Sequence, residues 1–167
     1  AFEALYIIQC GLWLLKKKYR EQQEGIRHLP NSNLLKQIYK QIPFALTQDQ
    51  QNVWQEICRD MEKILPMRRL VQGDVGSGKT IIAALALAKT IENGFQGILM
   101  APTEILASQH FDSMKNLFEP CGVRVGLLSG KLTTRQRDLT RPAAAEGPLD
   151  LVIGTHALNQ EEDCFAR

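Results

Sequence analysis

The chain has 167 residues, which fits one compact domain or one domain with an appended segment. Its hydrophobic content of 44% is ordinary for a globular protein, and its net charge of +2 does not by itself point to nucleic acid. The apolar run over residues 5–15 is too short to span a bilayer, and its lysines follow it, whereas the positive charge of a signal peptide comes first. We therefore expect a cytoplasmic protein without a membrane partner.

The basic surplus lies in the N-terminal segment, residues 1–43, which carries seven Lys and Arg against three Asp and Glu. Apolar residues at three- and four-residue spacing predict one amphipathic helix over residues 1–24. Its basic end, residues 16–20, either is a solvated helix end that complements the helix dipole or contacts phosphates. Residues 25–33 are predicted to be a linker and residues 34–42 a short helix. Because the first residue is Ala, we expect a piece of a longer protein.

The four cysteines, Cys10, Cys58, Cys121 and Cys164, are isolated in the sequence. None forms a C-x-x-C pair, so the spacing gives no zinc or redox pattern. We expect single thiols, buried or half-buried, in a reducing cytosol.

A second domain is predicted to begin at residue 44, and its first helix runs from residue 47 toward Pro66. Thr47 and Gln50 match the capping-box pattern, in which each side chain bonds the backbone of the other. The alternative for Gln50 is a contact with adenine, because its amide offers one acceptor and two donors to the adenine edge. The sequence leaves both interpretations open.

The chain is organised around residues 73–80, which match the phosphate-loop pattern G-x-x-x-x-G-K-[ST]. Glycines let the loop point its N–H groups at phosphate oxygens, and the following helix adds its positive end. Residues 69–72 are predicted to be a strand and residues 81–88 a helix that ends at Asn93 and Gly94; the alternative is an ordinary glycine turn. We expect Lys79 to reach the β- and γ-phosphates of ATP and Thr80 to hold Mg²⁺. The predicted nucleotide-binding loop consists of Gly73, Asp74, Val75, Gly76, Ser77, Gly78, Lys79 and Thr80.

Three more strands are predicted after this loop, over residues 97–101, 123–128 and 149–153, with a helix capped by Thr103 and a basic helix and loop over residues 131–147. Strands that alternate with helices predict an α/β fold with a parallel sheet, preceded by the helical segment. Ligands bind beyond the carboxyl ends of such strands. The turns there offer hydroxyls and amides that could hold a phosphodiester backbone without reading bases, or they are ordinary capped turns. They contain Pro102, Thr103, Ser129, Gly130, Thr155 and His156.

At this point four stretches, residues 44–50, 66–80, 100–110 and 152–158, resemble the RecG family of bacterial ATP-dependent DNA helicases in superfamily 2. The resemblance is close over residues 40–160 and looser before them. The transcription-repair coupling factors, which translocate on double-stranded DNA, have a similar motor and are the nearest competitor. The stretch over residues 101–107 and the basic helix before the motor favour the RecG family.

The resemblance implies a P-loop NTPase fold of the RecA type, with residues 44–167 as an incomplete first motor lobe and residues 1–43 as its linker. It implies a monomer that uses Mg-ATP to remodel branched DNA and stalled forks. Gln50 would contact adenine with Phe44 and Thr47 beside it. Pro102 and Thr103 would belong to one DNA-contacting motif, and the later turns to others.

The family's D-E-x-H box, which would hold Mg²⁺ and orient water, is expected on a strand beyond Arg167. The resemblance also implies a second motor lobe with an arginine finger and a wedge domain, neither of which is in this sequence. We therefore expect the isolated chain to hydrolyse ATP negligibly. A phosphate loop would also suit a small-molecule kinase, with Arg135, Arg137 and Arg141 as a lid, or a nucleotide-binding module without catalysis.

Overall fold

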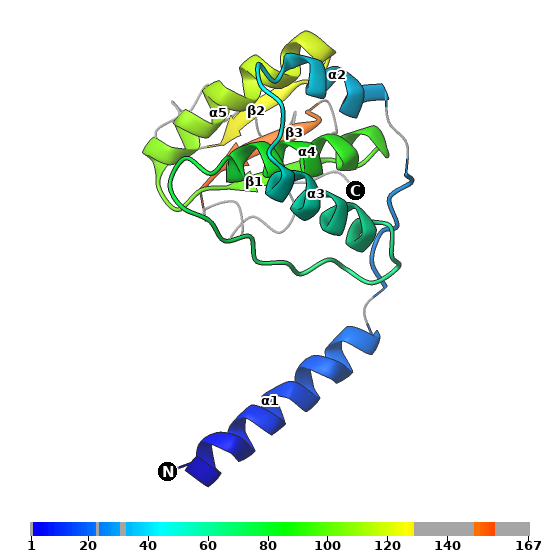
Figure 1. The fold of residues 1–167 in the computed structure, drawn as a ribbon, viewed down its shortest axis with the longest axis vertical. Coiled ribbons are helices and arrows are strands. Elements are labelled where there is room, and N and C mark those ends of the chain that lie inside the picture. The colour runs from blue at the N-terminus through cyan, green and yellow to red at the C-terminus, as the bar shows by residue number, and fades with distance from the viewer. Residues whose placement is uncertain (1, 23, 31–32, 129–148, 156–167) are drawn as a thin grey trace.

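The computed structural model describes residues 2–22, 24–30, 33–128 and 149–155, and for residues 16–22 it describes the backbone alone. The first helix, α1 (Phe2–Gln22), lies apart from the rest of the chain (Figure 1). Its large apolar side chains are all more than half exposed; they are Phe2, Leu5, Tyr6, Ile7, Ile8, Leu12, Trp13, Leu14 and Leu15. The predicted helix is therefore present, but its described apolar side chains lie outside the core. No helix in the described part of the chain is long and apolar enough to cross a membrane.

Two further helices precede the glycine-rich loop. Helix α2 (Asn33–Gln41) agrees with the predicted short helix, and α3 (Gln48–Met61) begins at the predicted cap. Thr47 is the N-cap of α3, and both bonds of the capping box are present. The apolar residues of α3 recur at helical spacing, so Trp54, Ile57 and Met61 enter the core.

The sheet has three parallel strands in the order β1-β3-β2. They are β1 (Gly97–Met100), β2 (Val125–Leu128) and β3 (Leu151–Gly154). Every residue of the central strand β3 is buried, as expected for a strand that is paired on both sides and covered. The parallel α/β fold is confirmed.

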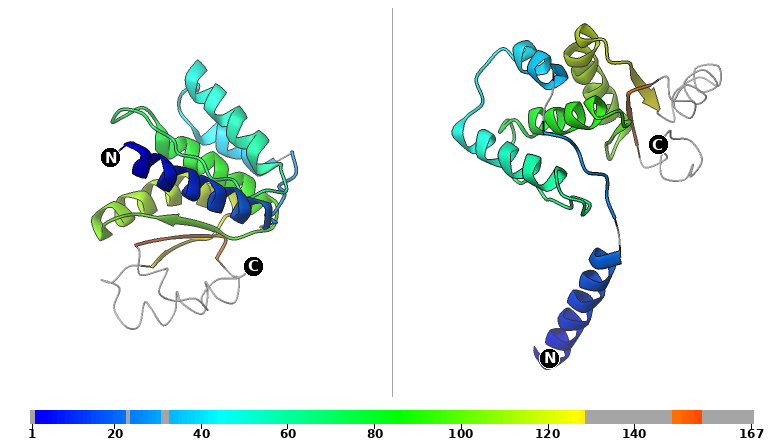
Figure 2. Two further views of the ribbon diagram at one scale, coloured as in Figure 1. Left: turned by 90° about the horizontal axis from the view of Figure 1, so that it is seen from below. Right: turned by 90° about the vertical axis from the view of Figure 1, so that its right-hand side faces the viewer.

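Helices α4 (Lys79–Glu92) and α5 (Glu104–Phe118) cover one face of this sheet (Figure 2). Helix α4 lies against β1, and α5 lies against β2 and β3. A short 3-10 helix, η1 (Glu119–Cys121), follows α5 at the predicted turn. The core lies between these helices and the sheet, and its largest fully buried side chains are Ile38, Leu85, Met114, Phe118, Leu151 and Ile153.

The strand predicted over residues 69–72 is wrong. These residues are neither helix nor strand, and their backbone makes no hydrogen bond to another described residue. Leu70 is 83% exposed, although Val71 packs against the core. A strand needs a hydrogen-bonded neighbour, and the three-stranded sheet described here does not extend to this segment. The prediction of four strands is corrected to three for the described residues.

Most of the other predicted element boundaries differ from the observed ones by one to three residues. Helix α4 begins at Lys79 rather than at residue 81, and it ends where predicted, with Asn93 as C-cap and Gly94 in the left-handed region at φ 82°. Cys10, Cys58 and Cys121 are half-buried free thiols, as expected. Cys164 and the basic segment over residues 131–147 lie outside the described residues.

Candidate nucleotide-binding site

The glycine-rich loop has the backbone that the phosphate-loop pattern requires. Gly76 and Gly78 take φ values of 83° and 82°, in the left-handed region that favours glycine. The Ser77 N–H donates to the Asp74 carbonyl at 3.1 Å and closes the turn. The loop therefore curls before it enters α4, as an anion cradle does.

Helix α4 presents an uncapped N-terminus to this loop. Its N-cap is Gly78, which has no side chain to accept from the first turn. The first N–H groups of a helix have no acceptor inside the helix, and they carry the positive end of the helix dipole. Lys79 and Thr80 lie in this first turn. This end of α4 is therefore suited to bind an anion such as phosphate.

The Lys79 ammonium group is held by the loop itself. It donates to the carbonyl oxygens of Gly73 at 2.7 Å and Asp74 at 2.6 Å, and it lies 3.4 Å from the Ser77 hydroxyl. These are weaker acceptors than phosphate oxygens, because bonds to an ionised acceptor are stronger. The cation is thus placed at the loop and can exchange carbonyl acceptors for an anion.

Gln50 joins α3 to the glycine-rich loop. Its amide oxygen accepts from the Thr47 N–H at 2.9 Å, and its backbone N–H donates to the Thr47 hydroxyl at 3.3 Å. Its side-chain NH₂ group donates to the Ser77 carbonyl at 2.9 Å. The capping-box interpretation of Gln50 is confirmed. The contact with the loop was not predicted from the sequence.

A cavity of about 450 Å³ opens between α3, the glycine-rich loop and α4. Seven of the residues predicted for nucleotide binding line it: Thr47, Gln50, Gly73, Asp74, Gly76, Ser77 and Lys79. Four others do not line it: Phe44, Val75, Gly78 and Thr80. Phe44 and Val75 are exposed, and Gly78 lies beneath the Gln50 amide, where a Cβ atom would clash. The structure therefore brings most of the predicted site together.

Five residues that sequence reasoning missed complete the lining: Asp49, Val53, Val71, Gln72 and Ile82. Helical spacing could have identified two of them. Val53 is three residues after Gln50, and Ile82 is three residues after Lys79, so each shares a helix face with a predicted residue. Val53, Val71 and Ile82 add apolar side chains to the lining, and a mixture of apolar and polar groups is typical of small-molecule sites.

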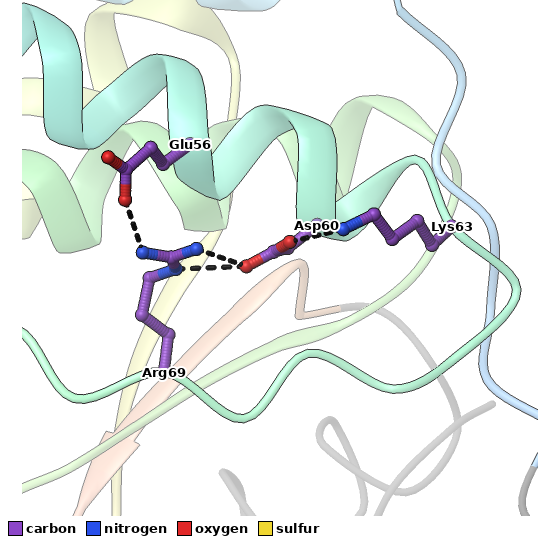
Figure 3. Close-up of polar contacts among 4 residues, drawn as sticks. All are labelled: Glu56, Asp60, Lys63 and Arg69. Atoms are coloured by element: carbon purple, nitrogen blue, oxygen red, sulfur yellow. Dashed lines mark hydrogen bonds and ion pairs between the residues drawn. The ribbon is translucent and has the colours of Figure 1, made fainter. Parts of the chain in front are cut away.

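An ion-pair cluster connects α3 to the segment that leads into the loop (Figure 3). Arg69 donates to Asp60 at 2.9 Å and 2.6 Å through two nitrogens and to Glu56 through a third. Lys63 donates to the other oxygen of Asp60 at 2.8 Å. The hydrogen bonds from Lys63 and Arg69 hold the pKa of Asp60 below its usual range, and the hydrogen bonds that Arg69 donates to Asp60 raise the pKa of Arg69.

The turns predicted to contact DNA follow strand ends that are aligned in the sheet. Met100 of β1 and Leu128 of β2 both pair with Gly154 of β3. The turns after these residues therefore leave one edge together. Pro102 and Thr103 are exposed, and the Thr103 hydroxyl accepts from the Leu106 N–H at 3.3 Å, which confirms the predicted cap of α5. Thr155 is half-buried, whereas Ser129, Gly130 and His156 lie outside the described residues.

Comparison with known proteins agrees with this geometry. Residues 47–162, more than half of the chain, match the DEAD/DEAH box helicase family. The chain belongs to this helicase family. The hypothesis of a small-molecule kinase is therefore wrong.

The resemblance to RecG is also confirmed. The chain is 44% identical to the ATP-dependent DNA helicase RecG of Bacillus subtilis, over 96% of this chain and 24% of that protein. It is 43% identical to RecG of Streptococcus pneumoniae, over 99% of this chain and 24% of that protein. The chain thus spans about a quarter of the length of these helicases.

Solved helicase structures have the same fold. A structure of RecG bound to a three-way DNA junction matches with a TM-score of 0.88 and 41% identity, over 99% of this chain and 22% of that chain. A hypothetical ATP-dependent RNA helicase from Sulfolobus tokodaii matches with a TM-score of 0.58 and 19% identity, over 78% of this chain and 36% of that chain. The second likeness shows the fold alone, which is the RecA-like fold that the sequence predicted.

Proposed function

We propose that this chain is the nucleotide-binding part of an ATP-dependent DNA helicase of the RecG type. Residues 44–167 belong to its first RecA-like motor lobe, and residues 1–43 lead into that lobe. The observation that carries the proposal is the cavity between α3 and α4, where the curled loop, the uncapped end of α4 and the Lys79 ammonium group meet. These groups suit a bound polyphosphate.

The groups that line this cavity suit the phosphates of ATP, and Thr80, which does not line it, follows Lys79 in the first turn of α4. Lys79 would leave the Gly73 and Asp74 carbonyls and bond the β- and γ-phosphates, and the Thr80 hydroxyl would hold Mg²⁺. Gln50 would use its amide for the adenine edge, with Phe44 and Thr47 beside it. The remaining loop residues, Asp74, Val75, Gly76, Ser77 and Gly78, would surround the phosphates.

For the whole helicase we propose branched DNA and stalled replication forks as substrates, as the RecG relatives suggest. The aligned strand ends would contact the DNA backbone through Pro102, Thr103, Ser129, Gly130, Thr155 and His156. The helicase would work as a cytoplasmic monomer. This lobe would cooperate with a second motor lobe and a wedge domain.

Lys79→Ala in the complete helicase tests the nucleotide site. The variant should lose ATP hydrolysis and bind a fluorescent ATP analogue much more weakly, because the phosphates lose their cation. Lys115→Ala is the matched control: Lys115 is exposed on α5, and its contacts, Glu119 at 3.9 Å and the Phe111 ring, lie on or beside the same helix. Unchanged turnover in the Lys79 variant would show that the loop does not hold phosphates.

Gln50→Ala tests whether this residue does more than cap α3. We expect analogue affinity to fall and the melting temperature to fall only as far as in Thr47→Ala, which removes the cap hydroxyl. Gln48→Ala is the control, since the Gln48 side chain is exposed and bonds Asn52 on the same helix. If Gln50→Ala lowers the melting temperature and leaves affinity intact, the residue is a cap alone.

A further inference from the structure

The segment that leads into the glycine-rich loop, residues 64–72, contacts both the chain that follows α1 and helix α3. We call it the lead-in segment. Its residues 69–72 make no backbone hydrogen bond to the described part of the chain, and Ile64, Leu65 and Leu70 are at least half exposed. Among the described residues, side chains and close approaches hold the path of the chain into Gly73.

One anchor of the lead-in segment is Arg69, which reaches α3. Its guanidinium group bonds Asp60 through two nitrogens and Glu56 through a third (Figure 3). A planar guanidinium group shared between two carboxylates fixes direction as well as distance. Helix α3 also carries Gln50, which bonds the Ser77 carbonyl of the loop. Arg69 therefore connects the residues just before the loop to α3, the same helix that contacts the loop at Ser77.

The other anchor comes from residues 24–30, the strap, which follow α1. The Gly25 N–H donates to the Ile64 carbonyl. An added Cβ atom at Gly25 would lie 2.7 Å from the Pro66 nitrogen and 2.9 Å from the Ile64 oxygen. Both are backbone atoms, which cannot rotate away as a flexible side chain can. Only glycine lets the strap come this close to the lead-in segment.

The strap also makes two hydrogen bonds to the ends of α3 and α4. The His28 N–H donates to the Met61 carbonyl at 3.0 Å, at the end of α3. The Leu29 N–H donates to the Asn93 side-chain oxygen at 2.7 Å, at the end of α4. The His28 ring also meets the Phe95 ring edge-on, with centroids 5.8 Å apart. The strap thus bridges the ends of the two helices that border the cavity.

We propose that Gly25 and Arg69 are positioning residues for the nucleotide site, which hold the lead-in segment from the strap and from α3. Neither residue lines the cavity. They act through the path of residues 64–72 into the loop. This inference rests on the proposed nucleotide-binding function.

The test measures binding of a fluorescent ADP analogue to the complete helicase, below the melting temperature of each variant. Gly25→Val and Arg69→Ala should each weaken binding roughly 2- to 30-fold, the range seen for residues that act through others. Gly25→Ala should give a smaller loss, because its methyl group displaces Pro66 less. Arg69→Lys should recover part of the affinity, since it keeps the charge but not the fork.

Two control variants are available in the chain. Gly11→Ala places a methyl group where nothing lies within 4 Å. Arg59→Ala removes an exposed arginine from the same helix, α3, that makes no ion pair within the described residues. Both should bind the analogue as the parent does. The double variant Gly25→Val/Arg69→Ala should lose less than the product of the two single losses, because both residues hold one segment.

The outcomes separate this inference from the function on which it rests. If the parent binds no nucleotide and Lys79→Ala changes nothing, the proposed function is wrong and the inference falls with it. If the parent binds but Gly25→Ala and Arg69→Ala bind equally well, only the inference is wrong. If these variants melt at lower temperatures but bind the analogue with the affinity of the parent, the inference is wrong and the proposed function is unaffected. If Gly25→Val fails to fold, Gly25→Ala and Arg69→Ala still test the inference.

Discussion

The two flanks of the glycine-rich loop are built in opposite ways. Downstream, α4 buries Ile82, Ala84, Leu85 and Ala88 between α2, α3 and β1. Upstream, the lead-in segment leaves Leu70 83% exposed and has no strand to pair with among the described residues. Among the described residues, one flank is fixed by packing and the other mainly by polar contacts.

This difference shows that apolar content alone does not decide what is buried. The lead-in segment and α4 are both rich in aliphatic residues, and α1 is too, yet of the three only α4 has fully buried residues among those described, and Val71 of the lead-in segment is partly buried against the core. A helix forms most of its backbone hydrogen bonds within itself, so it can pack wherever a partner surface exists. A strand must also find an edge. The backbone structure of the upstream flank therefore depends on neighbouring segments more than that of α4 does.

The largest expected effect is a cavity substitution on the downstream flank. Leu85 is fully buried, so Leu85→Ala should lower the free energy of unfolding of the 167-residue chain by about 2–5 kcal/mol. Leu70→Ala removes the same atoms from the exposed flank and should change it by about 0.5 kcal/mol or less. Urea unfolding followed by circular dichroism measures both. Equal costs would mean that the lead-in segment is packed in solution.

A smaller effect is expected where the two flanks meet. Lys89 of α4 is 4% exposed, and its ammonium group lies 2.6 Å from Glu62, the C-cap of α3 just before the lead-in segment. Glu62→Gln leaves a buried cation without its carboxylate and should cost about 1–3 kcal/mol, reduced because Glu62 is partly exposed.

Lys89→Met sharpens this prediction, because it removes the buried charge and keeps the apolar stem. It should be far less destabilising than Glu62→Gln, and neutral or stabilising if its side chain packs well. Thermal unfolding of the two variants side by side decides the matter. If Lys89→Met costs more than Glu62→Gln, the ion pair contributes net stability.

Most of the fold follows from local patterns in the sequence. Helical spacing identifies α3 and α5, and it gives their caps at Thr47 and Thr103 correctly because capping depends only on neighbouring residues. Gly94 is recognisable as the end of α4 for the same reason. The segment over residues 69–72 is predicted wrongly, because strand formation depends on a partner that local sequence does not reveal.

The part of the candidate site that lies within one sequence motif can be predicted from the sequence. The loop and Lys79 follow from glycine spacing alone. The contact between Gln50 and Ser77 joins residues 27 positions apart, and the approach of Gly25 to Pro66 spans a still longer stretch. Such contacts are set by how helices pack, so no window of sequence contains them. For Gln50 the sequence offers capping or adenine binding, whereas the structure adds a contact with the loop itself.

The smallest expected effect is that of low pH on the ion pairs of Asp60, which hold the lead-in segment upstream of the loop. Hydrogen bonds from Lys63 and Arg69 lower the pKa of Asp60, so this carboxylate contributes stability that is present above its unfolded pKa. That stability is lost as pH falls through the lower, folded pKa. In the parent, the urea midpoint should therefore fall as the pH is lowered from about 5 to about 2. Arg69→Ala should make this decrease smaller, whereas Arg59→Ala should show the same decrease as the parent. Parallel pH profiles for the parent and Arg69→Ala would mean that packing, not the ion pairs, holds the lead-in segment.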